Sequence, residues 1–142
     1  MNILIIGAGK MGYSIGSIWA DIKNLDIHMV DKSPSRRVFI KEKKKNILVT
    51  QDIPDNWKGD IVVLAVKPQT FKSAAKQISS TRMITKNIIS IMAGISASKI
   101  SKLLNTKTPI TRIMPNISIN VNLGVSCILF PKKISKNNAQ LV

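Results

Sequence analysis

The sequence predicts an α/β fold built on a doubly wound, mostly parallel sheet, with its last helix truncated. Short apolar runs alternate along the chain with segments whose apolar residues recur at helical spacing. A Gly-x-Gly-x-x-Gly sequence, Gly7 to Gly12, directly follows the first apolar run. Together these features indicate a Rossmann-like arrangement. With 142 residues, the chain is expected to form one domain, 1–142.

The first half of the chain supplies three of the expected strands. The apolar run at 2–6 predicts a strand buried on both faces, and further strands are expected at 26–30 and, more weakly, at 46–49. One apolar helical face follows the first strand and is formed by Met11, Ile15, Ile18, Trp19 and Ile22. The Ser33-Pro34-Ser35 sequence predicts the start of a basic helix that continues to Lys44.

The second half continues the same alternation. Four more strands are expected, at 60–66, 88–92, 109–114 and 124–130. The apolar faces of two intervening helices are formed by Phe71, Ala74, Ala75 and Ile78 and by Ile100, Leu103 and Leu104. Ser96 or Ser98 would cap the second of these helices. Ser135 is expected to cap a final helix that the end of the chain cuts off.

The glycine-rich loop carries the main functional signal. Gly7 permits a tight turn, Gly9 lets the backbone approach a pyrophosphate, and Gly12 lets the helix pack closely on the strand. The N–H groups at the helix N-terminus would then hold the phosphates. Asp31 follows Gly12 at the spacing that dinucleotide sites require. We therefore expect an NADP or NAD site rather than a merely tight strand–helix turn.

The residues after the second strand give conflicting indications about the dinucleotide. Asp31 could accept hydrogen bonds from the ribose 2′-OH, which favours NAD. Lys32, Ser33, Arg36 and Arg37 follow at once, and cations with a hydroxyl suit the 2′-phosphate of NADP. A solvated helix start explains these basic residues equally well. The choice between the two cofactors therefore stays open.

Three more loops are expected at the carboxyl edge of the sheet, where such folds bind ligands. Ala65–Pro68 ends the central strand and Ile91–Gly94 ends the next one. Asn116, after Met114-Pro115, could hold substrate or nicotinamide or could simply cap its own turn. The pattern offers no carboxylate pair, metal-ligand cluster or nucleophile elbow, which suits hydride transfer by a cofactor.

The lone histidine and the lone cysteine are both expected to be structural. His28 lies inside a predicted strand and is interpreted as a core or edge residue rather than a base. Cys127 lies in an apolar strand and is interpreted as inert packing. A single cysteine also excludes a disulfide framework.

Four short sequences occur in an order that is specific to one family. They are Ile6–Gly12, Ala65–Gln69, Ser90–Ile95 and Arg112–Asn116. Together they resemble the N-terminal domain of the pyrroline-5-carboxylate reductases, and the resemblance covers essentially the whole chain. It implies reduction of 1-pyrroline-5-carboxylate, a small-molecule substrate, to L-proline by hydride transfer from NAD(P)H.

The resemblance also implies a set of cofactor contacts. These are Ile6, Gly7, Ala8, Gly9, Lys10, Met11, Ser33, Asp52, Ala65, Val66, Lys67, Pro68, Ile91, Met92 and Ala93. Asp52 stands where the family often has asparagine, and Ile117 and Ser118 replace a usual Thr-Pro pair. The family's C-terminal helical domain, which forms a homo-oligomer and most of the substrate site, is expected to be absent here.

Composition argues against other classes of protein. The formal net charge is +15, but 18 of the 22 basic residues are scattered lysines and aromatic residues make up only 4%. Few aromatic side chains are therefore available to stack on bases, which makes a nucleic-acid partner unlikely. No run approaches 18 apolar residues, and Met1–Ala8 lacks the features of a signal peptide. We expect a cytoplasmic protein without membrane contact.

The expected truncation leaves a second hypothesis open. The chain could be a non-catalytic dinucleotide-binding module or a remnant of a larger reductase, which would bind cofactor without turnover. In either case we expect exposed apolar surface where a further domain would dock, with poor solubility or self-association as the consequence.

Overall fold

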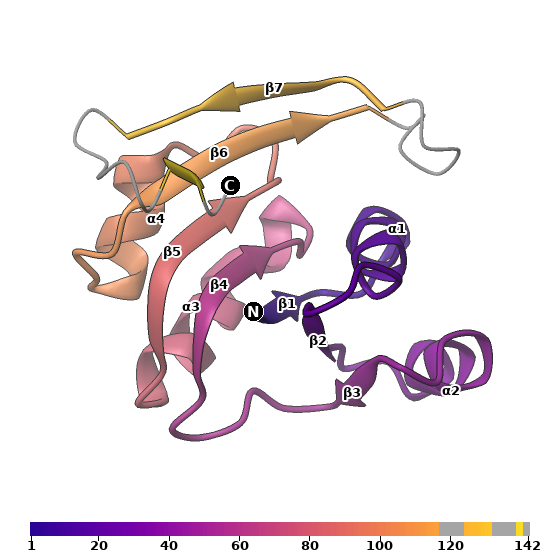
Figure 1. Ribbon diagram of the computed structural model, residues 1–142. Coiled ribbons are helices and arrows are strands. Elements are labelled where there is room, and N and C mark those ends of the chain that lie inside the picture. The colour runs from indigo at the N-terminus through magenta and orange to yellow at the C-terminus, as the bar shows by residue number, and fades with distance from the viewer. Residues whose placement is uncertain (117–123, 132–138, 141–142) are drawn as a thin grey trace.

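The computed structural model describes residues 1–116, 124–131 and 139–140 and shows one twisted sheet covered by helices on both faces (Figure 1). Its strands are β1 (Asn2–Ile6), β2 (Asp26–Val30), β3 (Leu48–Thr50), β4 (Lys58–Leu64), β5 (Ile84–Ser90), β6 (Ile110–Pro115) and β7 (Ser126–Leu129). The strand order is β3-β2-β1-β4-β5-β6-β7. Only the β6–β7 pair among these strands is antiparallel. The predicted α/β, mostly parallel fold is confirmed.

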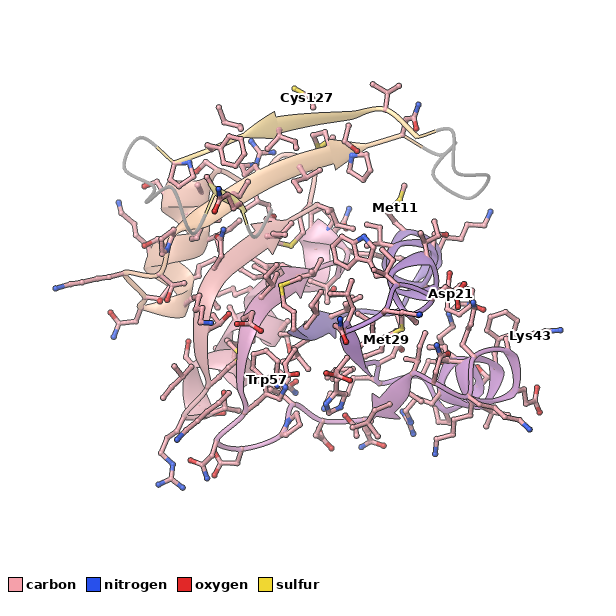
Figure 2. All side chains as sticks on the ribbon, viewed as in Figure 1. Met11, Asp21, Met29, Lys43, Trp57 and Cys127 are labelled. Carbon is pink, nitrogen blue, oxygen red and sulfur yellow. The ribbon has the colours of Figure 1, made fainter. Side chains whose placement is uncertain are left out.

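The helices form two layers, one on each face of the sheet. They are α1 (Lys10–Trp19), α2 (Pro34–Lys43), α3 (Phe71–Ser80) and α4 (Ala97–Leu104), and a short 3₁₀ turn, η1 (Pro68–Thr70), precedes α3. Successive residues of a strand point to opposite faces. Leu4 and Ile6 accordingly belong to the core under α3 and α4, whereas Ile3 and Ile5 belong to the core under α1 and α2. Figure 2 shows Met29 inside this second layer.

The order of the strands creates a crevice at the edge of the sheet. From β1 the chain runs outward through β2 to β3 and then crosses to β4 on the other side of β1. The connections from β1 and from β4 therefore diverge to opposite faces, and the carboxyl ends of these two strands flank the position where ligands bind in such sheets. The glycine-rich loop follows β1 at this point.

Several predicted boundaries shift in the structure. Strands β4 and β5 begin earlier and end earlier than expected, and the pairing of Lys58 with Ile84 extends both beyond the core. Apolar runs mark the buried part of a strand, but backbone hydrogen bonds define its ends, so exposed residues were missed. Helix α1 ends at Trp19, which leaves Ile22 half exposed instead of on the buried face.

The prediction for Cys127 is wrong. Strand β7 is the edge of the sheet, and Cys127 is exposed on it (Figure 2). An apolar strand was read as buried, but an edge strand has a neighbour on one side only. The final helix expected from Ser135 begins at residues that lie outside those described.

The caps of two helices are explicit. Ser33 Oγ accepts a hydrogen bond from the Arg36 N–H at the start of α2, and Ser96 Oγ accepts one from the Lys99 N–H at the start of α4. The structure thus selects Ser96 over Ser98 as the cap. None of the helices in the described part of the chain has the length and apolar character needed to cross a bilayer.

Candidate functional site

Two glycines of the loop after β1 are required by the protein itself. Gly7 has φ +98°, and a Cβ there would lie 2.8 Å from backbone atoms of Ala65 and Val66. A Cβ on Gly12 would lie 2.1 Å from the Gly7 carbonyl oxygen. Because these neighbours are backbone atoms, they cannot give way to a side chain. The backbone of the loop therefore packs closely against both the end of β4 and the first turn of α1.

Gly9 is different. It is the N-cap residue of α1 with φ −61° and ψ −169°, a conformation open to any residue, and a Cβ there would meet nothing within 4 Å. Neither backbone strain nor packing explains a glycine at this position. The space above it lies at a helix N-terminus, where backbone N–H groups and the helix dipole favour an anion. The loop therefore fits the pyrophosphate cradle predicted from the sequence.

Asp31 joins the glycine-rich loop to the loop after β2. One carboxylate oxygen accepts a hydrogen bond from the Ala8 N–H at 2.8 Å, and the other accepts one from the Ser33 N–H at 2.9 Å. The Gly7 N–H donates to the Val30 carbonyl at 2.9 Å. These bonds fix the two loops relative to each other. Asp31 thus has a structural role that the sequence pattern, which indicated only the ribose, did not reveal.

A cavity of about 310 Å³ opens beside this loop at the carboxyl ends of β1, β2 and β4. Seven of the predicted cofactor residues line it: Ile6, Gly7, Gly9, Asp31, Ala65, Val66 and Lys67. Lys32, one of the candidate contacts for a 2′-phosphate, also lines it. The sequence missed five other lining residues: Val30, Ile53, Thr70, Ala74 and Gln77. Ala74 had been placed only on an apolar helix face, and Ile53 lies in an irregular segment that gave no periodic signal. Apolar walls with a charged mouth suit the adenosine half of a dinucleotide.

The basic residues that follow β2 are already engaged by protein groups. Lys32 forms an ion pair with Asp52 at the surface. Arg37 donates to the carbonyls of Asp31 and Lys32, both at 2.8 Å, and to Gln51 Oε1 at 3.1 Å. Ser33, besides capping α2, has its hydroxyl 3.0 Å from that of Ser35. Their predicted contact with a 2′-phosphate therefore stays a prediction.

Arg36 reaches back to the glycine-rich loop. Its Nε donates to the Ala8 carbonyl at 2.5 Å, and Nη2 lies 3.4 Å from the Gly9 carbonyl oxygen. The guanidinium also stacks on the rings of Tyr13 and Phe39, at 4.9 and 4.8 Å from their centroids. Together with Lys10 it lines a second, shallower hollow beside α1.

The loop after β5 lies next to the end of β4. The Ile91 N–H donates to the Leu64 carbonyl at 3.2 Å, so Ile91 sits beside Ala65–Pro68. The Met92 side chain is buried, and its carbonyl oxygen lies 3.4 Å from Arg112 Nη2. Ala93 is exposed. These two loops, both predicted to contact the cofactor, are therefore neighbours.

Asn116 has a protein partner. Its Oδ1 accepts a hydrogen bond from the Val125 N–H at 3.2 Å, and its own N–H donates to the Val125 carbonyl at 3.2 Å. These bonds link the end of β6 to the start of β7, and a contact with substrate stays a prediction. Met11 is the second residue of α1, and Pro68 is the first residue of η1.

His28 is buried in β2, with Nε2 2.8 Å from Thr50 Oγ1. Burial disfavours the imidazolium and lowers the pKa of this side chain. His28 lies in a strand core away from the glycine-rich loop. The interpretation of His28 as a structural residue agrees with this placement.

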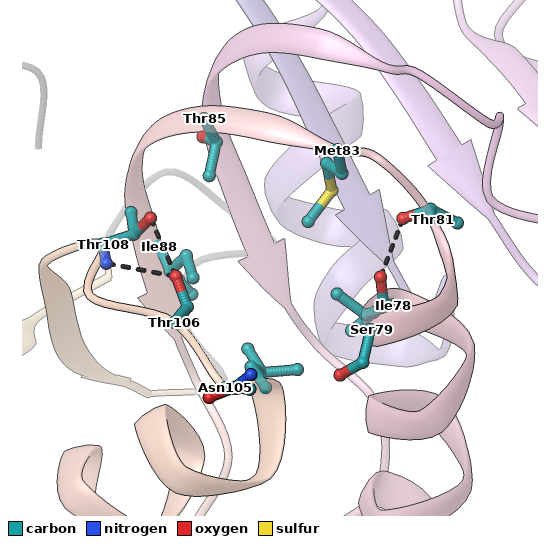
Figure 3. A pocket seen from close by; sticks show the side chains of 10 residues that line it. Ile78, Ser79, Thr81, Met83, Thr85, Ile88, Asn105, Thr106 and Thr108 are labelled. Atoms are coloured by element: carbon teal, nitrogen blue, oxygen red, sulfur yellow. Dashed lines mark hydrogen bonds between the residues drawn. The ribbon is translucent and has the colours of Figure 1, made fainter.

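A separate cavity of about 270 Å³ lies near the amino end of β5, away from the carboxyl ends of the strands (Figure 3). It is formed where α3 and α4 end and where β5 begins. The Thr81 hydroxyl donates to the Ile78 carbonyl, and the Thr106 hydroxyl bonds to that of Thr108. Helix C-termini and self-paired hydroxyls make a poor site for phosphates. The crevice at the carboxyl edge is therefore the candidate cofactor site.

The family can now be stated. A family model described as NADP oxidoreductase, coenzyme F420-dependent, matches residues 2–94, which extend from β1 through the loop after β5. The chain belongs to this oxidoreductase family. The predicted NADP or NAD cofactor and the predicted resemblance are confirmed at this level.

Curated relatives of this oxidoreductase have a common name. The pyrroline-5-carboxylate reductase of Vibrio alginolyticus is 32% identical over 140 residues, covering 96% of this chain and 51% of the relative. That of Staphylococcus epidermidis is 33% identical over 134 residues, covering 92% and 49%. The chain spans about half the length of the curated relatives it matches.

Solved structures match over a similar share of their length. A pyrroline-5-carboxylate reductase from Coxiella burnetii superposes with a TM-score of 0.80 at 26% identity, covering 99% of this chain and 53% of that one. The enzyme of that name from Plasmodium falciparum, solved with NADP bound, superposes with a TM-score of 0.69 at 21% identity, which shows the shared fold.

Proposed function

We propose that this chain is the cofactor-binding part of an NAD(P)H-dependent reductase that converts 1-pyrroline-5-carboxylate to L-proline. The observation that carries the cofactor site is the open space above Gly9 at the N-terminus of α1. The substrate rests on the relatives' shared name and on the four sequence motifs, which extend past the cofactor loop to Asn116.

The residues of the crevice have separable tasks in this proposal. The Gly9, Lys10 and Met11 N–H groups, at the start of α1, would hold the pyrophosphate. The apolar wall formed by Ile53 and Ala74 would enclose the adenine, with Lys32 and Asp31 at the ribose end. The strand ends at Ala65–Pro68 and Ile91–Ala93 would support the nicotinamide.

The reaction needs little acid–base chemistry from these residues. When bound, NAD(P)H would supply the hydride for the C=N carbon, and a proton taken up from solvent by the nitrogen would complete the conversion to proline and NAD(P)⁺. The loop after β5 lies at the carboxyl edge of the sheet, the side on which substrate would enter. Because the relatives are about twice as long, we propose that a second, helical domain completes the substrate pocket and forms a homo-oligomer.

Fluorescence titration of the purified chain with NADPH and with NADH tests the cofactor site. Saturable binding of either is expected, and the tighter ligand identifies the preferred cofactor. Absence of binding by a chain shown to be folded by circular dichroism would contradict the proposal.

Turnover is a separate test. Oxidation of NAD(P)H that depends on 1-pyrroline-5-carboxylate would be measured with the chain alone and with the helical half of a relative added. Activity in either mixture supports the reductase. Saturable cofactor binding with no turnover in both would instead support a non-catalytic dinucleotide-binding module.

A further inference from the structure

Arg36 occupies an unusual place for a cation that follows the second strand. The sequence leaves open whether it contacts a 2′-phosphate or lies at a solvated helix start, and the structure instead turns it inward onto the glycine-rich loop. Its guanidinium donates to two successive carbonyls, those of Ala8 and Gly9, from helix α2. Both carbonyls belong to the segment that the cofactor site depends on.

The stacking contacts fix this orientation. Tyr13 lies on α1 and Phe39 on α2, and their rings meet edge to face with centroids 5.2 Å apart. The guanidinium lies within 5 Å of both ring centroids, which is the range of cation–π attraction. Arg36 is also half-buried. A planar cation held on two rings and two carbonyls has little freedom to swing toward a ligand.

The bonded carbonyls determine where the adjacent N–H groups point. In a trans peptide the C=O of one residue and the N–H of the next point in opposite directions. Holding the Ala8 and Gly9 carbonyls toward Arg36 therefore directs the Gly9 and Lys10 N–H groups away from it. These N–H groups stand at the N-terminus of α1, where no preceding turn can accept them.

Asp31 and Val30 also bond to the loop, and the Gly9 carbonyl accepts the Tyr13 N–H of α1 at 2.9 Å as well. The Ala8 carbonyl and the Ala8 and Gly7 N–H groups are thus held from the side of α2 and β2. We propose that Arg36 is a positioning residue, which preorganises the N–H groups of the glycine-rich loop for the pyrophosphate and does not read the 2′-phosphate. This inference rests on the proposed cofactor site. It predicts that Arg36 matters equally for NADH and NADPH, because the pyrophosphate is common to both.

The test is Arg36→Gln in the full chain, compared with Arg82→Gln as a control of the same charge change. Arg82 is exposed and pairs with Asp55 at the amino end of β5, far from the crevice. Loss of charge-assisted bonds to the loop should weaken NADPH and NADH binding by the same factor, about tenfold. Arg82→Gln should leave both affinities unchanged.

A second measurement needs no cofactor. Hydrogen–deuterium exchange of residues 6–13 in the cofactor-free chain should become faster in Arg36→Gln, since the loop loses its anchor. Tyr13→Leu, which keeps the charge and removes one stacking ring, should produce a smaller change in exchange and in both affinities. Thermal unfolding of each variant checks that the measurements refer to folded protein.

Three results would overturn the inference. A loss confined to NADPH would show that Arg36 contacts the 2′-phosphate after all. Unchanged affinities would show a purely structural residue, and unchanged exchange of the loop would show that Arg36 does not order it. If the wild-type chain binds neither nucleotide, the proposed function fails, and the exchange measurement alone decides whether Arg36 orders the loop.

Discussion

At the scale of single residues, Gly7 and Gly9 belong to one motif but serve different ends. Gly7 is held at φ +98° against the backbone of Ala65, so the fold itself demands it. Gly9 has an ordinary conformation and open space around its Cα. A Cβ at Gly9 would therefore meet no protein atom, and it would lie where the proposed pyrophosphate site is. Gly7 is therefore expected to matter for the stability of the fold, and Gly9, two residues later, for ligand binding.

Gly9→Asn should leave the unfolding temperature close to that of the wild type, because asparagine is a good N-cap residue, and should reduce NADPH and NADH affinity by at least roughly tenfold, because its side chain would occupy the pyrophosphate cradle. Gly7→Ala serves as the contrast. It should lower the free energy of unfolding by at least about 1–2 kcal/mol, because an L-residue is strained at positive φ. Thermal unfolding and nucleotide titration check both. Loss of stability in Gly9→Asn would contradict the assignment.

His28 predicts a pH dependence of stability. Burial lowers its pKa in the folded chain below the ordinary value of 6.5. As the pH falls below 6.5, the unfolded chain therefore takes up a proton that the folded chain does not, and the free energy of unfolding decreases. Urea unfolding between pH 8 and pH 5 should show this decrease, with a weaker dependence in His28→Gln. An equal slope in both proteins would count against the burial argument.

At the scale of elements, helix starts depend on single side chains. The sequence left two serines as candidates for the cap of α4, and only Ser96 bonds the Lys99 N–H, at 3.2 Å. Ser98 lies one position inside the helix and is exposed. The cap satisfies one of the N–H groups that the helix leaves without an internal partner.

Ser96→Ala should therefore reduce the free energy of unfolding by about 1 kcal/mol. Ser98→Ala should leave it unchanged or raise it slightly, because alanine is the better helix former. Chemical denaturation of both variants measures the difference. Equal effects of the two substitutions would mean that the cap does not contribute.

At the scale of the whole molecule, the two edges of the sheet differ. The β6–β7 edge exposes five large apolar side chains: Met114, Val125, Ile128, Leu129 and Phe130. Residues 124–131 carry no charge, in a chain whose net charge is +15. Edge strands without charges are prone to pair with another chain. At the opposite edge, β3 exposes Leu48.

We expect a second copy of the chain to cover this uncharged edge at high concentration. Sedimentation velocity should show self-association that increases with concentration and falls in Ile128→Lys, because a lysine on an edge strand opposes pairing. Leu48→Lys, which adds the same charge at the other edge, should leave association unchanged. A monomeric wild-type chain at high concentration would contradict the expectation.

The sequence by itself determined the succession of strands and helices along the chain, the glycine-rich character of the loop after the first strand and most of the residues that line the crevice. These follow from local patterns: apolar period, turn residues and the spacing of glycines. Each described strand except the exposed β7 was found by its buried part, and Gly7, Gly9 and Gly12 were assigned roles that agree with the space around them. The loops at Ala65 and Ile91 were found because carboxyl ends of parallel strands share one edge.

The tertiary structure alone decided where the charged side chains go and which strands form the edges. Spacing placed Asp31 and Arg36 near the ribose. It could not show that Asp31 accepts a hydrogen bond from the Ala8 N–H or that Arg36 donates one to the Ala8 carbonyl. Likewise, Cys127 looked buried until β7 proved to be the outer strand. The physical reason is the same in each case. Local patterns are set by neighbours in the chain, whereas a flexible charged side chain and an edge strand take their surroundings from residues far away in sequence.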